Sequence, residues 1–217
     1  MALGRIDPIL IRKGDQLPTE ILWIVPACAL VLGYLLGSIP FGVLLTRWGG
    51  AGDLRSIGSG NIGATNVLRT GRKGLAAATL LLDMLKGAAA VWIVEALFPG
   101  NAMLAAAAAF LGHCYPVWLN FKGGKGVATL MGIVVALYWP LGLIYAAVWI
   151  GLLATLRVSS VAGMAAAVSG PVAAALFGRF DLVMLLLALA LIVLWKHGPN
   201  IERLITGTEP RIGRQNG

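Results

Sequence analysis

Long apolar runs, separated by short glycine-rich or charged segments, make up most of this chain. The runs cover about residues 21–45, 74–97, 101–119, 127–156, 161–178 and 181–196. Most of them approach the length of about 17–25 residues that a helix needs to cross a bilayer. The pattern therefore predicts an all-α integral membrane protein.

The run 127–156 is too long for one simple span and carries a break signal in its middle. Tyr138, Trp139 and Pro140 combine aromatic side chains typical of a membrane interface with a residue that interrupts helices. We expect two helices there, joined as a hairpin, which gives seven transmembrane helices in the whole chain.

The positions of Lys and Arg support seven spans, because cytoplasmic loops carry an excess of these residues. Seven spans place twelve Lys and Arg residues on one side and four on the other, whereas six spans place eight on each side. We therefore expect the N-terminus outside and the C-terminus in the cytoplasm. Loops 47–73, 120–126 and 157–160 and the tail 196–217 then share the cytoplasmic face. A ligand for these cations would produce part of the same asymmetry.

The composition agrees with a membrane protein. Of the 217 residues 59% are hydrophobic and 12% are charged, whereas a soluble domain has about 25% charged residues. Residues 1–20 form a polar N-terminal extension without the cleavage site of a signal peptide, and 21–217 form a single membrane domain. The two cysteines, Cys28 and Cys114, are too few for a metal or disulfide framework, so we expect no metal and no cofactor. The chain has a net charge of +8, and most of its Lys and Arg residues lie between the apolar runs. This placement favours anionic substrates and membrane lipids over nucleic acid.

Glycine-rich segments after the first run predict an anion site. They read GSIPFG at 37–42 and DLRSIGSGNIGATN at 53–66. Glycine lets backbone N–H groups turn toward an anion, a following helix adds its positive end, and an arginine could clamp phosphate oxygens. A flexible connector is the alternative, and the G-x-G-x-x-G at 58–63 lacks the strand that a dinucleotide site requires. The candidates are Ser38, Arg55, Gly58, Gly60, Asn61, Thr65 and Asn66.

A second loop, NFKGGKGVAT at 120–129, has the composition of a phosphate cradle. Two lysines, three glycines and the start of the next helix all favour an anion. The loop is not a Walker A motif, because Leu119 and Gly126 occupy positions that require Gly and Ser or Thr. The alternative is that the lysines only anchor the helix end. The candidates are Lys122, Gly123, Gly124, Lys125 and Gly126.

The C-terminal segment and one apolar run add further polar residues. His197 and Asn200 lie three residues apart across a Gly-Pro turn, and both can donate hydrogen bonds to oxygen. Asp83 and Lys86 lie within an apolar run at a spacing that allows pairing on one helix face. A functional role and a structural ion pair are about equally compatible with them.

Together with KHGPNIERLITGTEP at 196–210 as the third, these motifs closely resemble the three signature motifs of the bacterial acyl-phosphate glycerol-3-phosphate acyltransferase family, PlsY. The resemblance runs from Gly37 to Glu209 and includes LLDMLKG in the second run. It implies a seven-helix enzyme of phospholipid synthesis in the bacterial inner membrane, with its active site facing the cytoplasm. The implied reaction transfers a fatty acyl group from acyl phosphate to the 1-hydroxyl of glycerol 3-phosphate, giving lysophosphatidic acid and phosphate.

The resemblance also implies roles for single residues. Ser38, Arg55, Lys125, His197 and Asn200 correspond to substrate-handling residues, and Glu209 lies at the end of the third motif. Ser159 matches less closely, because Gly163 stands where the family usually has a second serine. The extension 1–20 departs from the family's short start.

The chemistry of an acyl phosphate favours direct transfer without a covalent enzyme intermediate, because phosphate is a good leaving group. Arg55, Lys125, His197 and Asn200 would neutralise phosphate charge, Ser38 would position the hydroxyl or the carbonyl, and the base would be His197 or a substrate phosphate oxygen. Thioester-using acyltransferases carry H-x-x-x-x-D, which this chain lacks. The alternative function is a membrane transporter of phosphorylated metabolites, although the cationic motifs lie at one face rather than at the midplane. The sequence leaves the oligomeric state open, and a monomer is possible.

Overall fold

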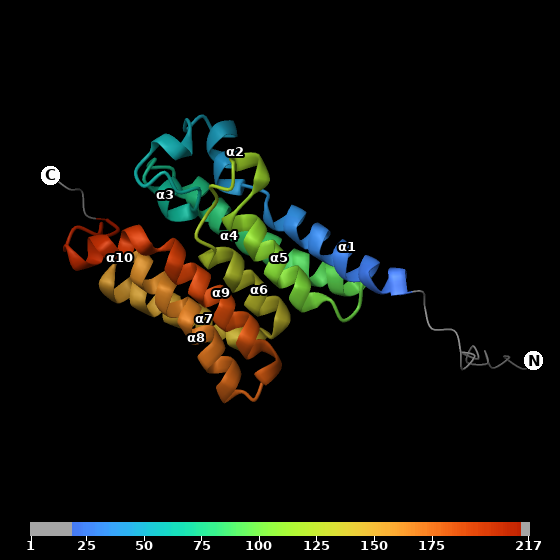
Figure 1. The fold of residues 1–217 in the computed structure, drawn as a ribbon. Coiled ribbons are helices and arrows are strands. Elements are labelled where there is room, and N and C mark those ends of the chain that lie inside the picture. Colours follow the sequence, from blue (N-terminus) through green and yellow to red (C-terminus); the bar gives the residue numbers. More distant parts are fainter. Residues whose placement is uncertain (1–18, 214–217) are drawn as a thin grey trace, which may run out of the picture.

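The computed structural model describes residues 19–213, with side chains from residue 23 onward, and this part of the chain is all helical. Figure 1 shows the longer helices packed as a bundle, with short helices in the connections. The longer helices are α1 (Thr19–Gly37), α4 (Lys73–Leu97), α5 (Ala102–Cys114), α6 (Val127–Leu137), α7 (Trp139–Leu156), α8 (Ser159–Leu176) and α9 (Phe180–Lys196). The short ones are α2 (Phe41–Trp48), η1 (Leu54–Ser56), α3 (Ala64–Leu68), η2 (Val117–Leu119) and α10 (Gly198–Ile205). The expected extension 1–20 lies almost entirely outside the described residues.

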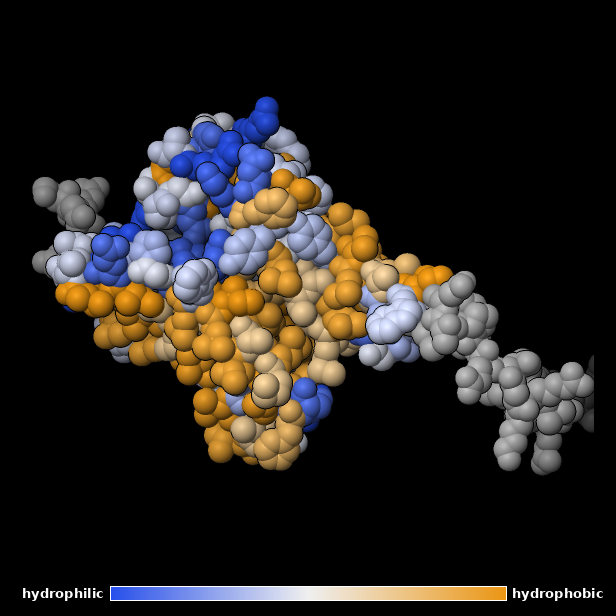
Figure 2. Space-filling model, in the orientation of Figure 1, coloured by the Kyte–Doolittle hydropathy of each residue, from blue (hydrophilic) through white to orange (hydrophobic). Residues whose placement is uncertain are grey.

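The bundle has the surface of a membrane protein. Large apolar side chains such as Leu81, Leu176 and Trp195 point outward, more than half exposed, as lipid contact allows. Figure 2 shows this apolar surface around the helices, with hydrophilic residues gathered mainly over α2, α3 and α10. Among the described residues, five segments are long and apolar enough to cross a membrane, or six if α9 and α10 count as one bent span.

The expected hairpin within the run 127–156 is confirmed. The break falls at Tyr138, where α6 ends and α7 begins with Pro140 in its first turn. Proline suits this place because its missing N–H would have no partner there in any case. With 11 residues α6 is shorter than a full span, so the total of seven spans stays a prediction.

The first apolar run differs from the expected single helix. It is broken at residues 38–40, between α1 and α2, where Pro40 has no N–H to continue the helical hydrogen bonds. Lys86 of α4 donates a hydrogen bond of 2.7 Å to the backbone oxygen of Ile39, and its Nζ lies 2.7 Å from Oδ1 of Asp83. The pairing of Asp83 and Lys86 that their spacing allows therefore exists, and Lys86 caps the broken helix.

Small residues bring α4, α5 and their neighbours close together. A methyl group added at Gly37 would overlap the backbone of Ala109 in α5, and one added at Gly132 of α6 would overlap the carbonyl of Met84 in α4. Such close backbone approach is how helices associate tightly inside lipid. It fixes where the loops leave the bundle, and those loops form the site described next.

Candidate active site

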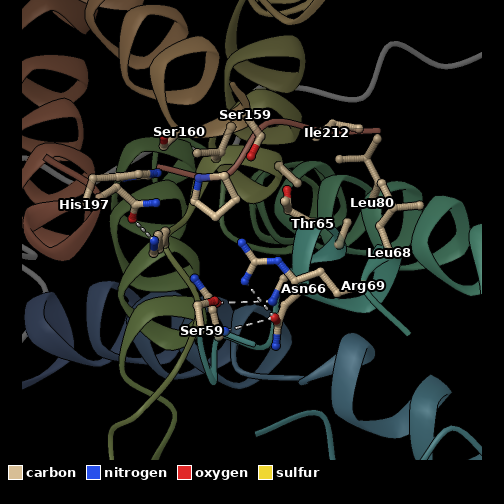
Figure 3. Close-up of a pocket in the computed structure, with 18 of the residues that line it drawn as sticks. Ser59, Thr65, Asn66, Leu68, Arg69, Leu80, Ser159, Ser160, His197 and Ile212 are labelled. Atoms are coloured by element: carbon tan, nitrogen blue, oxygen red, sulfur yellow. Dashed lines mark hydrogen bonds between the residues drawn. The ribbon is translucent and has the colours of Figure 1, made fainter. Parts of the chain in front are cut away.

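A cavity of about 700 Å³ opens where four parts of the chain meet at the hydrophilic end of the bundle. Most of its walls come from these four parts: the segment 59–71, the start of α6, the start of α8, and the α9–α10 turn with the tail 209–213. Leu80 and Asp83 of α4, His113 of α5 and Trp149 of α7 complete the lining. Figure 3 shows Ser159, Ser160 and His197 along one side and Ser59, Asn66 and Arg69 along the other. The cavity thus joins all three glycine-rich or polar motifs of the sequence.

Asn66 of α3 organises the first motif. Its amide Nδ2 donates to the backbone oxygens of Leu54 (3.0 Å) and Ile57 (2.9 Å). Its Oδ1 accepts from the backbone N–H of Ser59 (3.3 Å) and from Nη1 of Arg69 (3.3 Å). Because Asn66 is buried and these bonds occupy its amide, it orders the loop and places Ser59 and Arg69 at the cavity.

Lys125 supplies a cation from the loop before α6. Its Nζ donates to Oδ1 of Asn200, so the second and third motifs are in direct contact. Burial, followed by repulsion from cations such as Arg203 and Arg69, lowers the pKa of Lys125 to about 8. Gly126, which follows, has a φ of +87°, a conformation that glycine adopts without strain. An anion at this place would hold the lysine charged.

Glu209 ties the tail to the rest of the site. Its Oε1 accepts from Ser160 Oγ (2.6 Å) and Asn200 Nδ2 (2.6 Å), and its Oε2 accepts from Arg203 Nε (2.8 Å). Burial alone would raise the pKa of Glu209, but these three donors outweigh it and the pKa is lowered. The carboxylate is therefore charged, and it orients Asn200 toward Lys125.

His197 is buried at the C-terminal end of α9. Its Nδ1 lies 2.8 Å from the backbone oxygen of Val193, and since a carbonyl oxygen only accepts, Nδ1 carries the proton. Burial lowers the pKa of His197 to about 4. The imidazole is thus neutral, and Nε2, which has no hydrogen-bond partner among residues 23–213, can act as a proton acceptor.

Comparison with known proteins places this geometry in a family. A family model described as glycerol-3-phosphate acyltransferase matches residues 27–207. The chain belongs to this family. The glycerol-3-phosphate acyltransferase of Erythrobacter litoralis is 56% identical over 190 residues, which are 88% of this chain and 96% of that protein. The enzyme of the same name from Rhodopseudomonas palustris strain BisB5 is 58% identical over 189 residues, 86% of this chain and 96% of that one.

Solved structures of the family agree with the fold. The crystal structure of PlsY, an integral membrane glycerol 3-phosphate acyltransferase, in its glycerol 3-phosphate form has a TM-score of 0.82 at 36% identity, covering 87% of this chain and 96% of that one. The lysophosphatidic acid form of PlsY gives a TM-score of 0.79 at 34% identity, with 87% and 95% covered. The resemblance drawn from the three motifs is confirmed, as is an all-α, multi-pass membrane fold.

Within the family fold, the predicted site residues divide into two groups. Ser38 is buried, and its hydroxyl donates to the backbone oxygen of Leu35 (2.8 Å). Arg55 is half exposed and pairs with Asp53 (3.1 Å), and Lys122 is exposed. The cavity lining includes Asn61, Thr65, Asn66, Lys125, Gly126, Ser159, His197, Asn200 and Glu209; it does not include Ser38, Arg55, Gly58, Gly60, Lys122, Gly123 or Gly124.

The cavity also holds residues that the sequence analysis did not single out. They include Ser59, Arg69, Ser160 and Arg211. Arg69 could have been predicted from the sequence, because it follows the candidate Thr65 by four residues and would share a helix face with it. Ser160 had only its place beside Ser159, and Arg211 had no distinguishing pattern.

Proposed function

We propose that this chain transfers a fatty acyl group from acyl phosphate to the 1-hydroxyl of glycerol 3-phosphate, forming lysophosphatidic acid and phosphate. The observation that carries the proposal is the shared cavity with Arg69 and Lys125 beside the neutral His197. Both substrates bear phosphate, and cations near a buried site stabilise it. Relatives named glycerol-3-phosphate acyltransferase support the acceptor and the reaction class.

Two cations contribute to the cavity from different elements. Arg69 comes from the segment just after α3, and Lys125 from the loop before α6. In this proposal they neutralise the phosphate groups of the two substrates, and the hydroxyls of Ser59, Thr65 and Ser159 donate hydrogen bonds to phosphate oxygens. This gives the charge stabilisation that a phosphate leaving group needs.

The serine and arginine that meet substrate are then Ser59 of the first motif and Arg69, three residues after its end. Ser38 and Arg55 act from outside the cavity, Ser38 in the α1–α2 break and Arg55 at the loop surface with Asp53. Gly58 and Gly60, at φ of +54° and +68°, allow the turn that exposes Ser59.

The transfer is direct in this proposal. The 1-hydroxyl oxygen of glycerol 3-phosphate attacks the acyl carbon, the bond from that carbon to the phosphate oxygen breaks, and phosphate leaves with the bonding pair. The hydroxyl proton goes to His197 Nε2 or to a phosphate oxygen of the substrate. A pKa of about 4 makes His197 a weak base, which leaves the substrate phosphate in competition for this role.

An apolar part of the cavity suits the acyl chain. Leu68, Leu80 and Trp149 line it beside the polar residues. Apolar walls with a few convergent polar groups are typical of sites that bind an amphipathic ligand. A transporter of phosphorylated metabolites, the other function considered, is not favoured by the family to which the chain belongs.

The orientation belongs to the same proposal. Seven spans, with the N-terminus outside and the C-terminus in the cytoplasm of an inner membrane, place the cationic loops and the cavity on the cytoplasmic side. The excess of twelve Lys and Arg over four supports this arrangement. Residues 21–217 then act as one membrane domain.

A donor assay tests the proposal. Purified protein in lipid bilayers is incubated with labelled glycerol 3-phosphate and either acyl phosphate or acyl-CoA. We expect labelled lysophosphatidic acid from acyl phosphate, loss of product in Lys125→Ala, and retention in Lys122→Ala, a matched lysine outside the cavity. Product from acyl-CoA alone would contradict the donor, and no product from either donor would contradict the function.

A further inference from the structure

A cluster of polar side chains lies buried at one edge of the cavity. Asp83 of α4 and His113 of α5 both line it, and each residue is less than 5% exposed. Burying an ionisable side chain inside a membrane bundle costs free energy, so such a residue usually has an ion-pair partner or a function. Lys86 has such a role, because it pairs with Asp83 and caps the α1–α2 break. The contacts described so far give His113 no comparable role.

The side chain of His113 makes no hydrogen bond within the described part of the chain. Its Nδ1 is 3.8 Å from Asp83 Oδ1, which is too far for a hydrogen bond. The opposite edge of the ring, at Nε2, lies directly against Gly124. A methyl group built on Gly124 would overlap Nε2 and come within 2.7 Å of Cε1 and 3.1 Å of Cδ2.

The backbone of α5 holds the same loop. Gly124 N–H donates to the carbonyl oxygen of His113 (3.0 Å), and Gly123 N–H donates to that of Cys114 (3.2 Å). On the other side of Lys125, Gly126 packs so tightly on the ring of Phe110 that a methyl group there would overlap it. Lys125 therefore projects from between two glycines, each pressed on a ring from α5.

We propose that His113 is a positioning residue, whose imidazole packs on Gly124 and thereby sets where the Lys125 ammonium enters the cavity. The proposal rests on the function proposed above, in which Lys125 neutralises a substrate phosphate. His113 touches no substrate in it. Gly124 is required because any larger residue would push the loop away from the ring, and a displacement of about 1 Å at a reacting group can cost about 100-fold in rate.

A pair of compensating substitutions tests the packing. Gly124→Ala should lower kcat/KM at least about tenfold, since its methyl group displaces the loop. His113→Ala in the same chain should restore much of this loss, because it removes the ring that the methyl group overlaps. As a matched control, Gly151→Ala, at a glycine with open space around it, should lose little activity and gain nothing from His113→Ala. A double variant no more active than Gly124→Ala alone would overturn the proposal.

A second readout does not depend on acyl transfer. Mass spectrometry measures labelling of Lys125 by an amine-reactive reagent against pH. The midpoint should lie near pH 8 in the starting protein, and it should move to higher pH in His113→Ala, because the lysine gains solvent when the loop shifts. An unchanged midpoint would contradict positioning even if transfer from acyl phosphate is absent. Where His113→Ala does not fold, His113→Asn removes the Nε2 and Cε1 edge of the ring that lies against Gly124, and it carries the same expectations in a smaller degree.

Discussion

Asn66→Ala should disorder the loop of the first motif, because hydrogen bonds to this loop and to Arg69 occupy the Asn66 amide. The Asn66 amide donates two hydrogen bonds, to Leu54 (3.0 Å) and Ile57 (2.9 Å), and accepts two longer ones of 3.3 Å from Ser59 and Arg69. A net hydrogen bond contributes about 0.5–1.5 kcal/mol. The two shorter bonds alone therefore stabilise the ordered loop by about 2 kcal/mol.

The loss of this free energy lowers activity because it lowers the fraction of molecules in which the loop is ordered. About 2 kcal/mol corresponds to a factor of about 30 in an equilibrium constant. If substrate binds only the ordered loop, kcat/KM falls in proportion to the fraction ordered. For a loop that is only marginally ordered before substrate binds, we expect a fall of up to about 30-fold in Asn66→Ala, and a comparable fall in Asn66→Asp, which keeps the size but loses both donors.

The assay is steady-state transfer to glycerol 3-phosphate, with hydrogen exchange of the segment 54–69 measured in parallel. Exchange in this segment should accelerate in the variant while α4 remains protected. Thr70→Ala is the control, because the Thr70 hydroxyl bonds only within the same turn and does not line the cavity. Wild-type kcat/KM together with unchanged exchange in Asn66→Ala would refute the reasoning.

Four further substitutions test the assignment of the site. Arg55→Ala should change kcat/KM by less than about threefold, as expected for an exposed ion pair, whereas Arg69→Ala should lower it about 100-fold; equal losses would contradict the choice of arginine. For Lys125, whose pKa is lowered to about 8, kcat/KM should fall as pH rises through about 8 and the ammonium loses its charge. Lys125→Arg should remove that fall, because the guanidinium stays charged, and a fall that persists would exclude Lys125 as its source. Glu209→Gln should cost about tenfold or more, because the amide replaces a charged acceptor of three hydrogen bonds; a near-normal rate would show that Asn200 needs no such support.

The apolar runs predicted the helices well, because lipid requires each span to satisfy its own backbone hydrogen bonds. The hairpin at Tyr138 followed from an aromatic pair before a proline. The break at Ser38 did not, because its stability depends on Lys86 from another helix, which donates to the carbonyl of Ile39. The sequence around Ser38 does not show which distant residue will hydrogen-bond to it.

The motifs predicted which segments form the site better than which side chains face it. All three meet at one cavity, yet Ser59 of the first motif and Arg69 just after it line the cavity, while Ser38 and Arg55 do not. The loop conformation decides this, and Asn66 fixes that conformation through carbonyls up to twelve residues away. Only the folded loop reveals that its amide is occupied by the protein.

Direct transfer within the cavity is the central claim, and its most direct test is phosphate release by purified protein. Protein is mixed with acyl phosphate, with or without glycerol 3-phosphate, and both released phosphate and the intact protein mass are followed over a single turnover. The account predicts release of phosphate only when glycerol 3-phosphate is present, with the protein mass unchanged throughout. Phosphate release without acceptor, accompanied by a protein heavier by one acyl group, would contradict it.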